Sequence, residues 1–126
     1  GCGAVIVWNF LLDDRHAPKR PGGCQNCYGA IDISSADYAT LTRRSHFYWI
    51  GHLAKVLHPG ARWLPLEGAL PEGVGATAAL NPNGTVGVFL VNSAGAERVV
   101  VLADGDFSAR FMAPAKSVSS LIWRGD

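Results

Sequence analysis

The chain has 126 residues, enough for a domain with a buried core. Hydrophobic residues make up 48% and charged residues 17% of it, a globular rather than a disordered composition, and the formal net charge is +1. A net charge this close to zero does not produce an electrostatic field that would attract nucleic acid. No membrane span is expected either, since no apolar run approaches the roughly 20 residues that a bilayer requires.

Residues 3–12 (GAVIVWNFLL) form a continuous run of apolar and β-branched side chains. Such a run is typical of a strand that is buried on both faces, as in parallel sheets and barrels. The chain begins with Gly rather than Met, and neither a basic stretch before the run nor a cleavage site after it indicates a secretory signal. We therefore interpret the chain as the tail of a longer protein, in which a signal peptide would not be visible.

Residues 13–30 form a long loop rich in Pro and Gly, and loops of this length in compact domains are usually functional or cross-linked. The basic residues between Arg15 and Arg20 have no aromatic side chains among them, which favours a solvated loop over a phosphate-binding patch. Asp13 and Asp14 are adjacent, and adjacent side chains on extended chain point to opposite sides. They are therefore expected to anchor a turn rather than to act as a pair of catalytic acids.

Residues 30–34 predict a short strand and residues 45–58 (SHFYWIGHLAKVLH) a helix. The apolar residues of the helix recur at helical spacing in a wide stripe, so the helix is expected to be mostly buried. Three histidines in this region, His46, His52 and His58, are six residues apart. This spacing rotates around a helix, which argues against a metal ion that all three share.

Downstream of residue 62, short apolar segments alternate with turn sequences. The predicted strands are residues 62–67, 74–81, 85–92, 97–103, 107–113 and 118–124. NPNG (81–84) and ADGD (103–106) are typical of tight hairpin turns. Strands at this regular spacing predict an antiparallel β-sandwich that begins near Gly60.

Four segments, taken together, are more specific: VWNFLLDD (7–14), the Gly-rich loop after it, FYWIGHLAKVLHPGARW (47–63) and SVSSLIWRG (117–125). In this order they resemble the C-terminal portion of glycoside hydrolase family 30, the family of glucosylceramidases and related β-glycanases. The GGCQNCYG loop is more similar to bacterial members than to the animal lysosomal enzyme. The resemblance covers nearly the whole chain.

This resemblance implies a fragment of a (β/α)8 barrel, namely its last strand, a loop and a helix, followed by an antiparallel β-sandwich that makes the chain mainly β. Residues 1–60 would be the C-terminal end of the catalytic barrel and residues 61–126 the β-sandwich side domain. Retaining glycoside hydrolysis needs two carboxyl groups, which in the family are glutamates on earlier barrel strands. The glutamates of this chain, Glu67, Glu72 and Glu97, all lie in the sandwich portion. The chain would thus contain no catalytic residue and be inactive alone.

The resemblance also implies part of a sugar site. Trp8 matches a tryptophan that lines the family's sugar pocket, where its flat face would stack on a pyranose ring while its N–H binds a hydroxyl. Asn9 adjoins it, and Asn26 in the following loop would reach a sugar hydroxyl. The expected partner is a β-glucoside, such as glucosylceramide or a β-glucan, bound together with the rest of the barrel, with no cofactor and no metal. By the same resemblance the protein would be secreted or periplasmic.

Two of the three cysteines, Cys24 and Cys27, are two residues apart in the loop. A redox pair should open a helix after a strand, whereas this pair lies between glycines in a loop. Structural zinc needs four ligands, which this pair together with Cys2 and His16 could supply. In a secreted hydrolase the simplest interpretation is a short-range disulfide that holds the rim of the pocket, with Cys2 left as a buried thiol.

The alternative function is a non-catalytic β-sandwich module that binds carbohydrate or serves as structural support. Exposed aromatic side chains in a row would favour it, whereas the spacing of the aromatic residues after position 62 suits a core better. A zinc-stabilised interaction domain is a third possibility, and such a domain would unfold when a chelator removes the metal.

Overall fold

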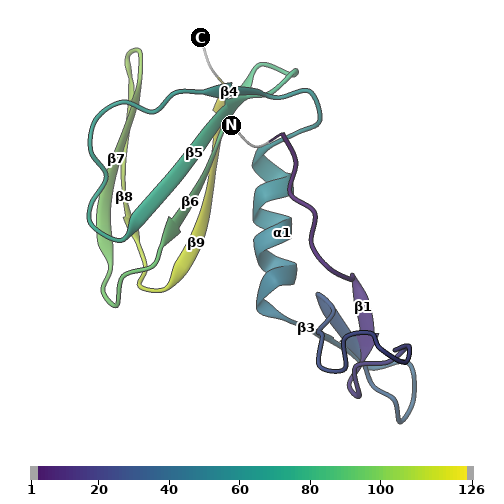
Figure 1. Cartoon of the computed structure of the whole chain (residues 1–126). Coiled ribbons are helices and arrows are strands. Elements are labelled where there is room, and N and C mark those ends of the chain that lie inside the picture. The colour runs from purple at the N-terminus through teal and green to yellow at the C-terminus, as the bar shows by residue number, and fades with distance from the viewer. Residues whose placement is uncertain (1–2, 125–126) are drawn as a thin grey trace. The chain divides into compact units, whose positions relative to one another are not determined.

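A computed structural model describes residues 3–124 of the chain (Figure 1). The chain divides into two units, Gly1–Ile50 and Gly51–Asp126, and the boundary between them falls inside the helix α1 (Ser45–Val56). The assignment of residues 1–60 to a barrel and of residues 61–126 to a side domain stays a prediction.

The first unit contains a small three-stranded sheet in the order β1-β2-β3. β1 (Leu11–Asp13) runs parallel to β2 (Ile31–Ile33), and β3 (Leu41–Arg43) runs antiparallel to β2. β2 is the strand predicted for residues 30–34, whereas β3, which is exposed and lacks an alternating pattern, was not predicted.

The strand predicted for residues 3–12 is wrong for most of its length. Only its last two residues belong to β1, and the residues before them are exposed except for the half-buried Asn9, with Ile6 95% and Trp8 70% accessible. An apolar run becomes a buried strand only where neighbouring strands pair with its backbone and cover its faces. β2 pairs with this run in register only from Leu11 onward, and the last bonds before it join the carbonyls of Asn9 and Phe10 to the amides of Ala30 and Ile31.

The predicted helix is present as α1, but the expectation that it is mostly buried is wrong. Within α1 only Val56 is buried, while the other apolar residues are half-buried or exposed. An apolar stripe is buried only where a second surface covers it. In the second unit the sheet reaches the helix at Val56 and at His52, whose Nδ1 lies 2.8 Å from Ser120 Oγ.

The second unit consists of two antiparallel sheets. One has four strands in the order β4-β5-β6-β9, and the other pairs β7 with β8. Their bounds are β4 (Arg62–Leu64), β5 (Val74–Leu80), β6 (Thr85–Asn92), β7 (Arg98–Asp104), β8 (Phe107–Ala113) and β9 (Ser117–Arg124). The hairpins predicted at NPNG and ADGD are confirmed, since β5 pairs with β6 and β7 with β8 across them.

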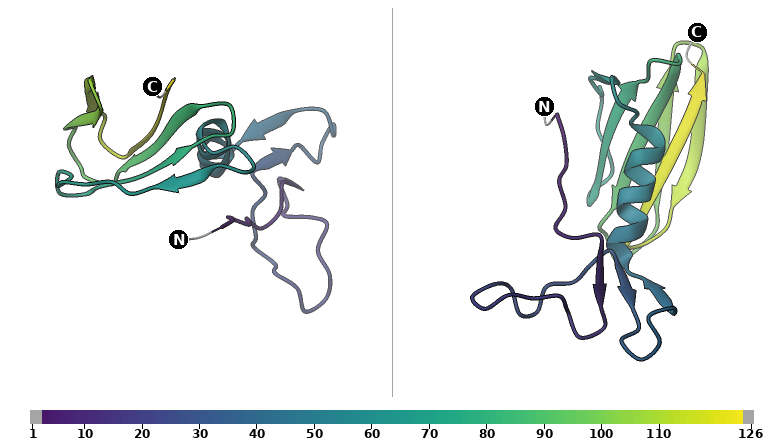
Figure 2. Two further views of the ribbon diagram at one scale, coloured as in Figure 1. Left: turned by 90° about the horizontal axis from the view of Figure 1, so that it is seen from above. Right: turned by 90° about the vertical axis from the view of Figure 1, so that its right-hand side faces the viewer.

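The two sheets pack face to face around an apolar core (Figure 2). Val88 and Leu90 of the four-stranded sheet lie against Val100 and Leu102 of the two-stranded sheet, and all four side chains are buried. Alternation along the strands explains the core, because every second residue of a strand points to the same face. The predicted sandwich is therefore confirmed, and the chain is mainly β with one α-helix in the described part.

Two buried asparagines fix the ends of these strands. Asn81, in the β5–β6 turn, donates from Nδ2 to the carbonyl of Val56 at 3.0 Å and accepts from the amide of His58 at 2.9 Å, so it binds the C-terminal end of α1. Asn92, at the end of β6, donates from Nδ2 to the carbonyls of Ala96, Ala113 and Pro114 at 2.9–3.0 Å. These contacts replace the hydrogen bonds to water that the two side-chain amides lose on burial.

Within residues 3–124, no helix is long and apolar enough to cross a membrane.

Candidate functional site

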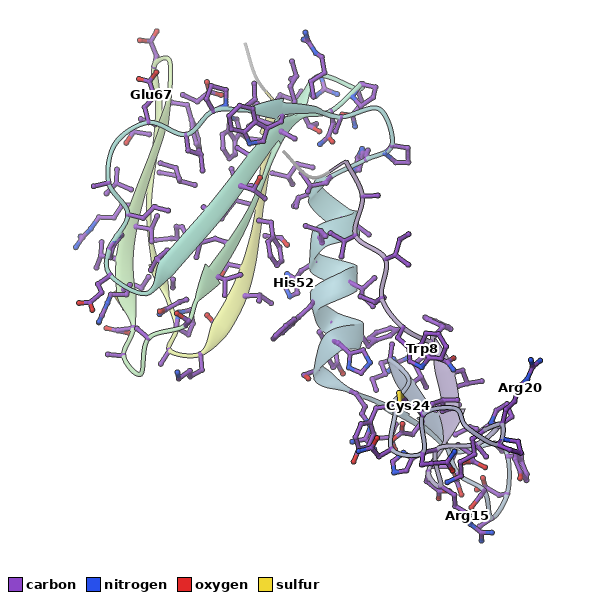
Figure 3. The ribbon with its side chains drawn as sticks, viewed as in Figure 1. Trp8, Arg15, Arg20, Cys24, His52 and Glu67 are labelled. Atoms are coloured by element: carbon purple, nitrogen blue, oxygen red, sulfur yellow. A yellow bond between two sulfur atoms is a disulfide. The ribbon has the colours of Figure 1, made fainter. Side chains whose placement is uncertain are left out.

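The first unit contains a hollow of about 310 Å³ that we call the Trp8 hollow. It lies between the chain that leads into β1 and the loop between β1 and β2. The side chains with polar or aromatic groups in its wall include Trp8, Asn9, His16, Lys19 and the Cys24–Cys27 pair. In Figure 3, Trp8 and Cys24 lie near each other at this place.

The position of Trp8 follows from the backbone around it. The carbonyl of Asn9 accepts a hydrogen bond from the amide of Ala30 at 3.3 Å, and that of Phe10 accepts one from the amide of Ile31 at 2.9 Å. These bonds tie the chain to β2 just after Trp8. Asn9 has a left-handed backbone with φ of 56°, which asparagine tolerates better than most residues. The indole of Trp8 is 70% exposed and so is accessible to a ligand.

The turn after β1 is organised by Asp13. Its Oδ1 accepts hydrogen bonds from the amides of Arg15 at 2.9 Å and Ala17 at 2.7 Å, and its backbone carbonyl accepts one from the amide of His16 at 2.9 Å. Asp14 Oδ1 accepts one from the amide of Ser35 at 3.2 Å, and bonding with Ser35 lowers the pKa of the Asp14 carboxyl. The expectation that the two acids anchor a turn is confirmed.

A disulfide joins Cys24 and Cys27, with an S–S distance of 2.07 Å and 5.7 Å between the Cα atoms. Gln25, between them, donates from Nε2 to the carbonyl of Gly23 at 2.9 Å and closes a tight turn. The loop returns to β2 past Gly29, where a Cβ would lie 2.7 Å from the amide nitrogen of Leu12. Only glycine permits this approach, which brings the loop against β1.

The three residues predicted for the sugar site are not all together. Trp8 and Asn9 are in the wall of the hollow, whereas Asn26 is exposed outside it, with Oδ1 3.5 Å from Cys24 Sγ. Of the basic loop residues, Arg15 extends away from Trp8 and Cys24 in Figure 3 and is not in the wall of the hollow, whereas Lys19 and Arg20 are wall residues. The roles of Trp8, Asn9 and Asn26 in sugar binding stay predictions.

One side-chain network beside the hollow was not predicted from the sequence. Asp32 of β2 forms an ion pair with Arg44, and this contact raises the pKa of the guanidinium. The Arg44 guanidinium carbon lies 4.4 Å from the ring centroid of Tyr28. The Tyr28 ring in turn meets that of His16 edge to face, with the centroids 4.6 Å apart. No local pattern could have indicated a network whose four members lie on three separate segments.

A smaller hollow of about 270 Å³ is lined mainly by apolar side chains, among them Leu11, Ile33 and Tyr38. Its one carboxylate, Asp13, already binds the turn described above. The three glutamates, Glu67, Glu72 and Glu97, are all exposed in loops of the second unit.

No group of three or more His, Cys, Asp and Glu side chains suitable for a metal ion occurs within residues 3–124. The zinc interpretation also needed Cys2, which lies outside the described residues.

Comparison with known proteins gives one family match. Residues 64–121 match the family model described as the glycosyl hydrolase family 30 beta sandwich domain. The endo-1,6-beta-D-glucanase neg1 of Aspergillus fumigatus is 29% identical over 96 residues, which are 72% of this chain and 19% of the fungal protein.

Two solved structures resemble the chain over nearly its whole length. The endo-beta1,6-glucanase BT3312 is 40% identical with a TM-score of 0.91, and the match covers 97% of this chain and 27% of that one. SrfJ from Salmonella typhimurium is 28% identical with a TM-score of 0.83, over 94% of this chain and 26% of that one. The chain thus spans about a fifth to a quarter of the length of these relatives.

Proposed function

Because residues 64–121 match the β-sandwich domain of glycosyl hydrolase family 30, and because the chain resembles the C-terminal portion of such enzymes as its motifs predicted, we propose that it is part of a retaining β-glucanase. In this proposal residues 1–60 complete a catalytic (β/α)8 barrel, and residues 61–126 form the side domain of that barrel. The catalytic carboxylates come from residues outside this chain, and the chain alone does not hydrolyse glycosides.

The substrate that we propose is a β-1,6-glucan. The observation that carries this choice is the likeness to BT3312, an endo-β1,6-glucanase, at 40% identity over 97% of the chain. The fungal relative is also named as an endo-1,6-β-glucanase. A glucosylceramide-type substrate has no comparable support, and we treat it as the competing outcome of the test. Secretion or export to the periplasm belongs to the same proposal, since a polymeric glucan is met outside the cytoplasm.

The Trp8 hollow supplies one wall of the sugar site in this proposal. The exposed indole of Trp8 stacks on the C–H face of a glucose ring, and its N–H donates to a hydroxyl. The side-chain amide of Asn9 both donates and accepts, as sugar hydroxyls do. The chemistry requires no metal or organic cofactor, because a nucleophilic carboxylate and an acid–base carboxyl perform both steps.

The test is an activity assay of the complete protein that contains this chain. It is incubated with β-1,6-glucan, β-1,3-glucan, β-1,4-glucan and glucosylceramide, and the released sugars are separated and their anomeric configuration is followed by NMR. We expect cleavage of the β-1,6-glucan with retention. Faster cleavage of glucosylceramide would change the substrate, and inversion would contradict the mechanism.

The same protein and this chain alone are then compared for glucan binding. Binding of the β-1,6-glucan by the chain alone, with no hydrolysis by the complete protein, would favour the alternative of a non-catalytic binding module.

A further inference from the structure

His16 is a second ligand-binding group of the Trp8 hollow, we propose, and the relay Asp32–Arg44–Tyr28 holds its imidazole in place. This inference rests on the proposed function, because it concerns how the same hollow binds a glucan. It adds a sugar-contacting residue and three positioning residues that neither the sequence motifs nor the family match assign.

The imidazole of His16 is available for a ligand. It is half-buried in the wall of the hollow that also contains Trp8. Within residues 3–124 no group forms a hydrogen bond with either of its ring nitrogens. A neutral imidazole offers one N–H donor and one acceptor, the same pair of functions that a sugar hydroxyl presents. A ring with both nitrogens bonded within the protein would have neither function free.

The backbone of His16 is held in an uncommon conformation. Its φ is 64°, in the left-handed region that is uncommon for residues other than glycine, although histidine, like asparagine and aspartate, adopts it more readily than most. The Asp13 side chain maintains it by binding the amides of Arg15 and Ala17 on either side. Such a conformation persists where the surrounding structure determines it, which is common at binding sites.

The side chain of His16 is held by Tyr28, which is not itself a wall residue of the hollow. The edge-to-face contact at 4.6 Å orients the imidazole, and Arg44 covers the Tyr28 ring at 4.4 Å. Asp32, only 7% exposed, holds Arg44 by the ion pair. An ion pair, a cation–π contact and an edge-to-face ring contact each favour one geometry. The buried carboxylate of Asp32 therefore positions the imidazole of His16 through Arg44 and Tyr28.

Arg43 provides a matched control for Arg44. It precedes Arg44 in the chain, as the last residue of β3, and it also places its guanidinium over an aromatic ring, that of Phe47, at 5.4 Å. Neither Arg43 nor Phe47 lies in the wall of the hollow. Replacement of Arg43 by Met therefore removes an equivalent charge and an equivalent cation–π contact without touching the relay.

The experiment measures kcat and KM of the complete protein on β-1,6-linked gluco-oligosaccharides. We expect His16→Ala, Tyr28→Leu and Arg44→Met to raise KM by about three- to tenfold with kcat nearly unchanged, as for the loss of one uniform binding contact. Tyr28→Phe should recover most of the loss seen in Tyr28→Leu, because the ring and not the hydroxyl makes both contacts. Arg43→Met should behave as the wild type.

A double-mutant cycle separates positioning from general damage. If Tyr28 acts through His16, the variant that combines His16→Ala with Tyr28→Leu should have the KM of His16→Ala alone. Additive effects of the two changes, or a wild-type KM in Arg44→Met, would overturn the relay.

NMR of 13C-labelled histidine in the complete protein supplies a readout that does not depend on activity. We expect the His16 ring signals, identified by their loss in His16→Asn, to shift in Tyr28→Leu and Arg44→Met but not in Arg43→Met. Unshifted signals would overturn the positioning. A wild-type protein that does not act on the oligosaccharides would instead overturn the proposed function and the sugar contact with it, while the NMR shifts still decide the relay.

Discussion

Gly87 of β6 lies so close to the carbonyl oxygen of Val56 that no side chain fits between the strand and the end of α1. The main chain of the helix thus packs directly on the main chain of the sheet within the second unit. Val56 is fully buried at this contact, and Asn81 binds its carbonyl from the neighbouring turn. One glycine therefore determines how closely the helix end approaches the sandwich.

Replacement of Gly87 by Ala should destabilise the chain by about 1–3 kcal/mol, because the new methyl group must displace either the helix end or the strand. Urea unfolding monitored by circular dichroism measures the change. Gly75→Ala is the matched control, since Gly75 is in the adjacent strand β5 and a Cβ there meets no atom within 4 Å. Equal stabilities of the two variants would contradict the close approach.

At the buried position of Asn92, a charged replacement should lower the stability of the chain more than truncation to alanine does. Asn92→Ala leaves three carbonyls without their donor and should cost about 1–3 kcal/mol in unfolding free energy. Asn92→Asp should cost more, since a carboxylate would then face those carbonyls without any proton to donate. Thermal unfolding of both variants, with the exposed Asn83→Ala for comparison, tests this order. An Asp variant as stable as the Ala variant would contradict it.

The loop between β2 and β3 should respond to acid through Asp37. Its carboxylate accepts hydrogen bonds from the Thr40 hydroxyl at 2.6 Å and from the amides of Thr40 and Ala39 at 3.0 and 2.9 Å, and the Thr40 hydroxyl contributes most to lowering the pKa of Asp37. Because the folded-state pKa lies below the unfolded value of about 3.9, this stabilisation is complete above that pH and disappears as the pH falls through the folded pKa.

NMR titration provides the measurement for Asp37. The carboxyl carbon of Asp37 should titrate below about pH 3.9, the model-peptide value, and the amide protons of Ala39 and Thr40 should follow it. In Asp37→Ala those two amide signals should lose their response at low pH. A midpoint at or above the model-peptide value would show that the hydrogen bonds do not favour the ionised form.

The Cys24–Cys27 disulfide should matter more to the loop than to global stability. The ring that it closes is short, so its entropic contribution is at most about 2 kcal/mol. Cys24→Ser combined with Cys27→Ser should therefore shift Tm modestly while hydrogen exchange in residues 18–29 becomes faster. Intact mass after alkylation, with and without a reductant, establishes the bond itself. Alkylation of both thiols without any reductant would contradict the disulfide.

Trp8 should contribute directly to glucan affinity. Trp8→Ala removes the exposed indole and should weaken the binding of β-1,6-gluco-oligosaccharides by about five- to tenfold, measured by calorimetry on the complete protein. Trp8→Phe should retain part of the affinity because a flat ring remains. Trp49→Ala is the control, as Trp49 is 57% exposed on α1 and outside the wall of the hollow. Equal losses in Trp8→Ala and Trp49→Ala would point to a general defect.

Local patterns predicted the sandwich well. β6 and β8 have the predicted bounds, and the turns at 81–84 and 103–106 join the predicted partners. Alternation and turn residues act over a few positions, so a sequence displays them directly. The same holds for the turn anchored by Asp13, where acceptor and donors lie within four residues of one another.

Contacts between segments that are distant in the sequence could not be predicted from such local patterns. The apolar run of residues 3–12 predicted a strand, yet a strand forms only where another pairs with it, and the ladder with β2 begins at Leu11. The helix stripe predicted burial, yet burial depends on the surface that covers it. Strand pairing and burial both depend on other segments of the chain, so the residues of one segment do not reveal them.

The sandwich strands, their turns and the similarity to a family could be predicted from the amino-acid sequence, because they depend on short-range order and on motifs kept in sequence. The place of His16 beside Trp8 and the Cys24–Cys27 pair in one hollow became evident only in the folded chain. The tertiary structure alone also connected Asp32 to His16 through Arg44 and Tyr28. The physical reason is that side-chain contacts at 4–5 Å depend on how the backbone folds back on itself, and that path results from hydrogen bonds and packing summed over the whole unit.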